Sequence, residues 1–223
     1  MAITLGSTGI TYSDSTTQLS KYSTAEDKGK LIQVNVYTPN PPYYSYAWVK
    51  PSGCTRVFVQ VVGGGGGSAS YCESGGAGGY TERVIDVTGV STVNVTIGGG
   101  GGAVGYYAGA GAGGTSSFGS YCSATGGYGA NNNVAHTGGH GGIGSGGDLN
   151  IWGGVGTGHG NTGGREAVGR GSPSFWGGPQ RASHSTNSPV GTAANGAGGT
   201  GGAMQAWVGS DGAPGMVVVY SYT

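Results

Sequence analysis

The residues that could support catalysis or bind a metal are few, and their spacing does not suit either task. His136 and His140 lie four residues apart, which brings two ligands onto one face only in a helix. Two of the three intervening residues are glycines, and glycine disfavours a helix. The acidic residues show no spacing typical of a catalytic triad or a carboxylate pair. We therefore expect no metal site, no cofactor and no catalytic residue, and predict that the protein is not an enzyme.

Residues 109–114 match the dinucleotide-binding pattern GxGxxG. In a true site this pattern follows a strand and opens a helix, and no βαβ context follows here. With 55 glycines in 223 residues, the pattern is expected to occur by chance. We interpret the match as coincidental.

Aromatic, amide and imidazole residues interrupt the glycine tracts and point to binding. Tyrosine and tryptophan beside serine, glycine and asparagine form the composition of antibody-like binding loops, in which rigid rings supply contact area. We predict that loop tips form a receptor-binding surface that comprises Tyr106, Tyr107, Tyr128, Asn132, His136, Phe175, Trp176 and Trp207. By contrast, Trp48 and Trp152 lie within strand-like patterns, and we expect both in the core.

Short alternating segments must position these residues. Apolar and polar residues alternate, without helical periodicity, in residues 46–50, 56–62, 80–87, 93–97, 148–152 and 215–223. Such segments, separated by turn signals, predict an all-β fold with a short-stranded β-sandwich frame. The first and last of these strands are expected to pair.

The glycine-rich run from residue 98 to 212 is expected to leave this frame at one end. Backbones without Cβ atoms can approach closely, and extended left-handed glycine helices of the polyglycine II type could pack side by side. Strict Gly-X-Y periodicity is missing, which argues against a collagen triple helix. The alternative is a set of mobile glycine loops. We favour packed legs, because aromatic residues recur between the tracts.

Residues 1–42 form a separate, polar lead before the domain at 43–223. A turn centred on Asp14-Ser15 predicts a small hairpin, and residues 31–37 alternate like a half-buried strand. The proline-rich segment 39–42 marks the boundary. The lead is too small to form much of a core, so we predict an attachment or oligomerisation arm. Its candidate attachment residues are Ile10, Tyr12, Leu31, Val34 and Val36.

Charge and cysteine content exclude several classes of function. Lysine plus arginine and aspartate plus glutamate balance at 9 each, whereas a phosphate-binding protein needs clustered positive charge, so we expect no nucleic acid partner. No apolar stretch approaches the roughly 20 residues of a membrane helix, so no membrane insertion is expected. Three cysteines without CxxC spacing are interpreted as buried or idle thiols.

Six segments carry a resemblance: 48–57, 61–67, 78–83, 114–119, 146–151 and 212–219. In order and spacing they resemble the glycine-rich domain carried by many tailed-phage fibre proteins, and the resemblance covers roughly residues 46–223. The chain is also loosely similar to the glycine-rich adhesins at the tips of T-even-type tail fibres, in which packed polyglycine helices present variable loops to a host receptor. Residues 9–18 are similar to a short motif near the attachment ends of phage fibre and appendage proteins.

The resemblance implies a virion structural protein, a tail-fibre or tail-tip adhesin assembled in the host cytoplasm. Its implied partners are other virion proteins, contacted through the N-terminal arm, and a host cell-surface glycan or outer-membrane protein. A homotrimer is the assembly that fibre proteins in general imply. The alternative is a head or neck decoration protein that uses the same glycine-rich domain.

Overall fold

The computed structural model describes residues 29–41, 44–69, 73–104, 108–131, 137–158, 170–178, 194–197 and 209–223, and the backbone of three N-terminal strands. These strands are β1 (Ile3–Gly6), β2 (Gly9–Tyr12) and β3 (Thr17–Gln18), which form an antiparallel sheet in the order β1-β2-β3. The pairing of β2 with β3 confirms the hairpin predicted around Asp14-Ser15. The side chains of Ile10 and Tyr12 lie outside the described part of the chain.

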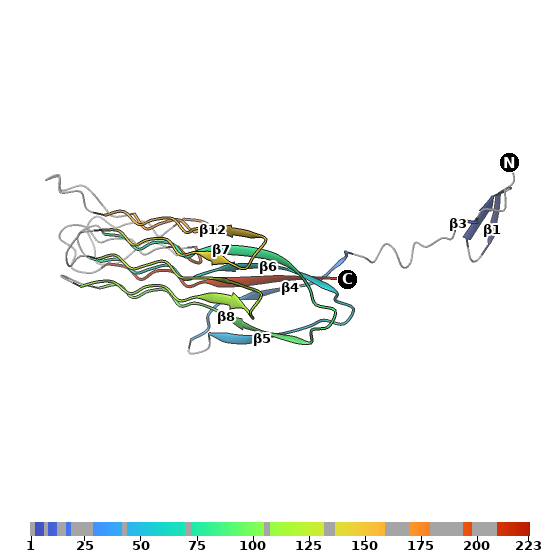
Figure 1. Ribbon diagram of the computed structural model, residues 1–223, viewed down its shortest axis with the longest axis horizontal. Helices are drawn as coiled ribbons and strands as arrows, with labels where there is room; N and C mark the ends of the chain where they lie inside the picture. The colour runs from blue at the N-terminus through green and yellow to red at the C-terminus, as the bar shows by residue number, and fades with distance from the viewer. Residues whose placement is uncertain are drawn as a thin grey trace.

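Two five-stranded antiparallel sheets form the frame (Figure 1). The first has the order β12 (Leu149–Ile151), β7 (Tyr80–Asp86), β6 (Arg56–Val62), β13 (Met216–Tyr222), β4 (Leu31–Tyr37). The second has the order β11 (Gly144–Ser145), β10 (Cys122–Ala124), β9 (Ser116–Phe118), β8 (Thr92–Thr96), β5 (Ser45–Val49). No helix occurs among the described residues, and the predicted all-β sandwich is confirmed.

The core lies between the two sheets and is built by alternation along the strands. Val57 and Val59 of β6 enter it from the first sheet, and Val95 of β8 enters it from the second. Trp48 is completely buried there, and its ring meets that of Phe118 edge-on at 5.7 Å. The expectation that Trp48 lies in the core is confirmed. Aromatic pairs in this geometry stabilise a core beyond their buried area.

One expectation about the strands is wrong. The first strand after the prolines, β5, pairs with β8, whereas the last strand, β13, lies between β6 and β4. Three candidate attachment residues, Leu31, Val34 and Val36, lie on β4 and are exposed, and their role in attachment stays a prediction. Tyr37 of β4 is the residue that packs against the core, because it lies opposite Val217, a core residue of β13. Although β4 precedes the boundary predicted at residue 42, it completes the first sheet.

The two ends of the frame differ. At one end the strands are joined by short turns, in which Gly53, Gly119 and Gly146 adopt positive φ. That conformation strains residues with a side chain, so the turns need glycine. At the other end the strands run on into extended glycine-rich segments, which lie side by side and project away from the sheets (Figure 1). We call each such segment a leg and name it by its residues.

The backbone of leg 63–69 donates hydrogen bonds to three neighbouring legs in strict rotation. Gly63 and Gly66 donate to leg 73–79, Gly64 and Gly67 donate to leg 108–115, and Gly65 and Ser68 donate to leg 209–215. The N–O distances lie between 2.8 and 3.1 Å. Every third N–H group therefore bonds to the same neighbouring leg, which is the pattern of a threefold helix of the polyglycine II type. The described legs therefore form a packed bundle rather than a set of mobile loops.

Glycine is required in the legs because neighbouring backbones leave no space for a Cβ atom. A Cβ atom on Gly66 would overlap the carbonyl group of Tyr128, and one on Gly64 would overlap the carbonyl oxygen of Gly99. Neither glycine has a positive φ, so backbone conformation alone would permit a side chain. The close approach of bare backbones is what allows neighbouring legs to bond directly.

Cys54 and Cys122 are buried free thiols, as expected, and Cys72 lies outside the described residues. Burial raises the pKa of the Cys122 thiol to about 11. The thiol is therefore protonated and inert near neutral pH.

The glycine legs yield a prediction with an internal control. Gly66→Ala should destabilise the protein by about 3 kcal/mol or more, at the upper end of overpacking effects, because its methyl group meets rigid backbone. Gly102→Ala adds a methyl group with nothing within 4 Å. It should be neutral or stabilising by up to about 1 kcal/mol, since alanine restricts the unfolded chain. Denaturant unfolding followed by circular dichroism measures both, and equal stabilities of the two variants would contradict the packing account.

Candidate binding surface

Three legs at the surface of the bundle expose a side chain at every third position. In leg 137–143, Thr137, His140 and Ile143 are exposed, whereas Gly139 and Gly142 are buried. A threefold helix explains this, because residues three apart project from the same side. One side of the leg therefore faces solvent, and the remaining positions face neighbouring legs.

Leg 125–131 has the same repeat and lies beside leg 137–143. Its exposed residues are Thr125, Tyr128 and Asn131. Their backbone N–H groups donate to the carbonyl oxygens of Ile143, His140 and Thr137, at 2.9, 2.8 and 3.1 Å. Exposed residues of the two legs thus lie opposite one another in pairs. The rings of Tyr128 and His140 meet edge-on, with centroids 6.5 Å apart.

Leg 152–158 adds a third exposed row. Gly153 and Gly156 donate to the carbonyl oxygens of Gly142 and Gly139, which fixes this leg beside leg 137–143. Trp152 and Val155 are three residues apart, and both are exposed, Trp152 by 72%. The expectation that Trp152 lies in the core is wrong. Strand β12 ends at Ile151, and Trp152 already follows the threefold repeat of the leg.

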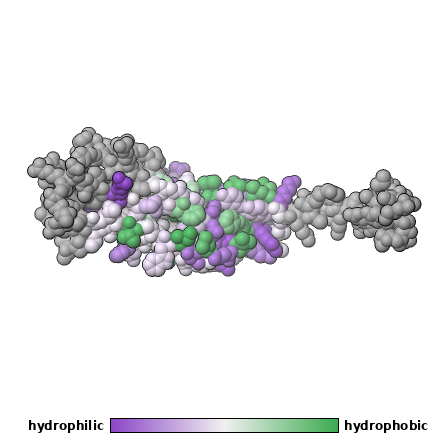
Figure 2. Space-filling model, turned by 90° about the horizontal axis from the view of Figure 1, so that it is seen from above, coloured by the Kyte–Doolittle hydropathy of each residue, from purple (hydrophilic) through white to green (hydrophobic). Residues whose placement is uncertain are grey.

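We call the exposed residues of these three legs the display face. It comprises Thr125, Tyr128, Asn131, Thr137, His140, Ile143, Trp152 and Val155. These side chains offer aromatic and aliphatic area, hydroxyl and amide groups and one imidazole, and none is an acid, a lysine or an arginine. Figure 2 shows strongly polar and strongly apolar side chains gathered over the strands, whereas the described parts of the legs are paler. The display face suits binding through rings and hydrogen bonds.

Tyr128 is thus the predicted site residue that the structure places on the display face. Its position is midway along a leg rather than at a tip, since its N–H and carbonyl groups both bond to other legs. The side chain is exposed, and that part of the prediction agrees with the structure. Its role in binding stays a prediction.

Phe175 and Trp176 occupy the two central positions of a tight turn, which the backbone hydrogen bonds between Ser174 and Gly177 close. Phe175 stacks on Tyr80, the first residue of β7, with ring centroids 3.7 Å apart and an interplanar angle of 15°. Trp176 meets the same ring edge-on at 6.0 Å. This turn packs on the junction between leg 73–79 and strand β7, and the role of both rings in binding stays a prediction.

Tyr80 is held at this junction by polar contacts as well. Its hydroxyl donates to Glu82 Oε2 at 2.6 Å and accepts from Gln60 Nε2 at 2.7 Å. Burial, followed by the bond to Glu82, raises the pKa of Tyr80 well above its ordinary value. The phenol therefore stays neutral and acts as a fixed part of the structure.

The other predicted tip residues, Tyr106, Tyr107, Asn132, His136 and Trp207, lie outside the described residues. Most of them fall between described leg ends. Val104 and Ala108 flank the first pair, and Asn131 and Thr137 flank the second pair. Asn131 and Thr137 exchange two backbone hydrogen bonds at 3.1 and 3.2 Å, which holds those leg ends together.

Sequence reasoning missed most of the display face, although a signal is present. The three legs read TGGYGAN, TGGHGGI and WGGV, so a residue with a side chain recurs after two glycines or small residues. This local triplet repeat is the sequence signature of a threefold helix with one solvent-facing side. It escapes notice when the whole glycine-rich run is compared with the strict repeat of collagen.

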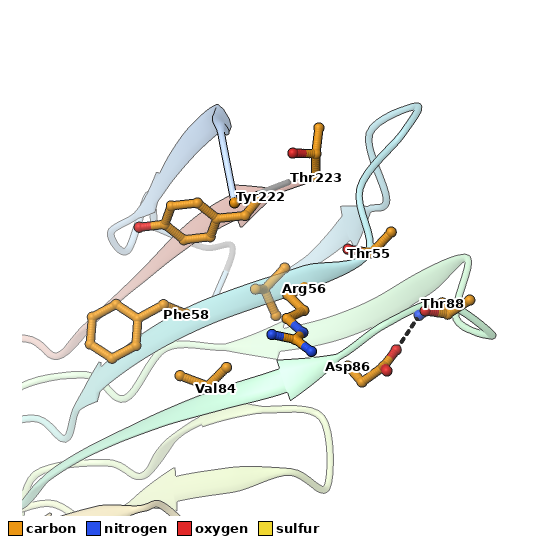
Figure 3. A pocket seen from close by; sticks show the side chains of 10 residues that line it. Thr55, Arg56, Phe58, Val84, Asp86, Thr88, Tyr222 and Thr223 are labelled. Carbon is orange, nitrogen blue, oxygen red and sulfur yellow. Dashed lines mark hydrogen bonds between the residues drawn. The ribbon is translucent and has the colours of Figure 1, made fainter. Parts of the chain in front are cut away.

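A shallow pocket of about 710 Å³ lies on the outer face of the first sheet. Figure 3 shows Arg56, Phe58, Val84 and Tyr222 around it, and Asp86 held by a 2.8 Å hydrogen bond from the N–H of Thr88. Hydrogen bonds from Thr88 lower the pKa of Asp86 below its ordinary value. The pocket lies near the turn end of the strands, away from the display face.

The described residues contain neither a metal-binding cluster nor a membrane-spanning helix. No group of three or more histidine, cysteine or acidic residues is arranged there to hold a metal ion. The described part of the chain also contains no helix with the length and apolar character needed to cross a membrane.

The fold and the surface define a class of protein: a β-sandwich whose strands continue into a bundle of glycine helices with a solvent-facing row of side chains. The chain belongs to the glycine-rich domain family, whose model matches residues 41–222. A comparison with curated proteins finds no match. The matched range begins after β4, which nevertheless completes the first sheet.

The two kinds of aromatic site residue should respond differently to truncation. Phe175→Ala should lower the free energy of unfolding by about 1–2 kcal/mol, because it removes a ring stacked on Tyr80 but half exposed. Tyr128→Ala should change it by less than about 0.5 kcal/mol, since that ring projects from the surface. Denaturant unfolding of both variants measures the difference. A larger loss for Tyr128→Ala would show that the display face is structural.

Proposed function

We propose that the protein is a structural component of a phage virion, a tail-fibre or tail-tip adhesin that binds a receptor on the host cell surface. The resemblance of its segments to phage fibre domains supports this proposal. The proposed role is binding without catalysis. The N-terminal arm, with Ile10 and Tyr12, would attach the protein to other virion proteins.

The observation that carries the proposal is the display face. The backbone groups of the legs form hydrogen bonds with one another. Contacts with a ligand are therefore made by the outward side chains. Those side chains stand on a backbone fixed from several directions, which limits the conformational entropy lost on binding. Tyrosine and tryptophan supply large contact areas with few rotatable bonds. A fixed row of such rings is suited to recognition of an extended surface.

The chemistry of the display face favours a glycan as the receptor. Its residues combine the exposed rings of Tyr128 and Trp152 with the polar groups of Thr125, Asn131 and Thr137. Sugar rings offer apolar faces for stacking and hydroxyl groups for hydrogen bonds, and a face without acidic, lysine or arginine side chains suits a neutral glycan. Weak contacts of this kind gain strength when several copies bind together.

A binding measurement tests the proposal. The double variant Tyr128→Ser/Trp152→Ser should bind intact host cells at least about tenfold more weakly than the unchanged protein, because it removes the two large exposed rings. Val49→Ser, on β5 of the frame and 65% exposed, is the matched control and should bind normally. Labelled protein counted on cells gives both values, with circular dichroism to show that the folds are intact.

Four outcomes separate the alternatives. Binding that is lost when outer glycans are stripped from the cells supports a glycan receptor, whereas binding that persists points to an outer-membrane protein. Unchanged binding by the double variant, and by Tyr106→Ser/Tyr107→Ser, would rule out the proposed surface. Antibody labelling of virions on the head rather than the tail would replace the adhesin with the decoration protein.

A further inference from the structure

The outer face of the first sheet, which points away from the sandwich core, carries exposed apolar side chains. Val34 of β4 is 43% exposed and Val84 of β7 is 56% exposed. Toward the legs this face is partly covered, since Phe175 and Trp176 pack on Tyr80. Contiguous apolar area on a protein surface commonly marks an interaction site.

The strand register arranges four of these residues in one row. Val34 lies opposite Tyr220 of β13, Tyr220 lies opposite Phe58 of β6, and Phe58 lies opposite Val84. The rings of Tyr220 and Phe58 are 5.8 Å apart. The row therefore reads aliphatic, aromatic, aromatic, aliphatic, and it has the same character from either end. Its midpoint falls between β13 and β6.

We propose that this face binds the same face of a second copy of the chain. The copies are related by a twofold axis that runs parallel to the strands, above the line between β13 and β6. This rotation places Val34 over the partner's Val84 and Tyr220 over the partner's Phe58. The same patch is used on both copies, as a twofold interface requires. Face-to-face sheets with nearly aligned strands are a common packing.

The next row toward the turns is also compatible with this arrangement. It consists of Leu31, Tyr222, Arg56 and Asp86. The rotation places Arg56 over the partner's Tyr222, a favourable cation–π pairing. It also places Asp86 over the partner's Leu31, an unfavourable contact that weakens the dimer, but no like charges meet. The pocket that Figure 3 shows on this face would then lie beneath the partner's Leu31 and the partner's Tyr222.

The size of the face predicts a weak dimer. Four strands spaced about 4.8 Å apart, each with five to seven residues at about 3.3 Å, give a footprint of roughly 400 Å² per copy. This falls at the small, transient end of protein interfaces. Because the axis runs along the strands, both sets of legs point in the same direction. The pairing therefore does not depend on the proposed receptor, yet it is compatible with two display faces that approach one surface.

Sedimentation of the full-length chain, from micromolar to millimolar concentration, tests the pairing. The unchanged protein should approach the mass of two chains as its concentration rises. Val34→Lys and Val84→Glu should each weaken the dimer at least about tenfold, because each buries a charge against a valine. Mixing the two variants should restore a dimer, since the introduced lysine then meets the introduced glutamate at one contact and the native valines meet at the other.

The control is Val49→Lys, which adds the same charge at an exposed valine of the other sheet and should leave the dimer unchanged. Circular dichroism shows whether each variant is folded. A single-chain mass at every concentration, or a mass of three chains, would overturn the proposal. So would a mixture of the two variants that associates no better than either variant alone.

Discussion

The whole structure depends on one constraint, the direct approach of one backbone to another without intervening side chains. Leg 63–69 shows it most clearly, because its N–H groups turn through three neighbours in order and return to the first. Its glycines leave no room for Cβ atoms at Gly64 and Gly66. Hydrogen bonding in several directions replaces the apolar core that such a segment cannot form. Glycine loses more conformational freedom on folding than any other residue, so this order requires a scaffold.

The β-sandwich is that scaffold. Its valine-rich core and Trp48 supply the apolar burial that the legs lack. The strands also set the alignment of the legs. The last pair of β6 and β7 joins Val62 to Tyr80, and the next hydrogen bond, from Gly63 to Gly79, already belongs to the legs. The legs therefore inherit their mutual positions from the sheet, and the transition from pleated strand to threefold helix takes place within one residue.

The fold class could be predicted because alternation along a strand is a local signal. The local sequence does not determine which side of a strand faces the core. The valines of β4 illustrate this. Alternation separates Val34 and Val36 from Asn35 and Tyr37, but pairing with β13 decides that Tyr37 faces inward. The expectation for Trp152 fails because it extends a two-residue period one residue beyond β12, where the period changes to three.

The candidate site divides in the same way. The exposure of Tyr128 follows from the triplet repeat around it and could be read from the sequence. The position of Phe175 could not, because its stacking partner, Tyr80, lies far away in the chain and is brought near only by the tertiary fold. The residues predicted at the tips, such as Tyr106 and His136, remain predictions.

The threefold geometry also limits how such a protein can change length during evolution. A leg completes one turn in three residues and advances about 9 Å per turn. Inserting or deleting a triplet in both legs of a pair preserves the rotational phase and adds or removes one outward position. An insertion of one residue rotates the remainder of the leg by a third of a turn and drives its side chains into the neighbouring backbones. Reach from the frame therefore changes in whole turns, and new surface positions arise without any change to the sandwich.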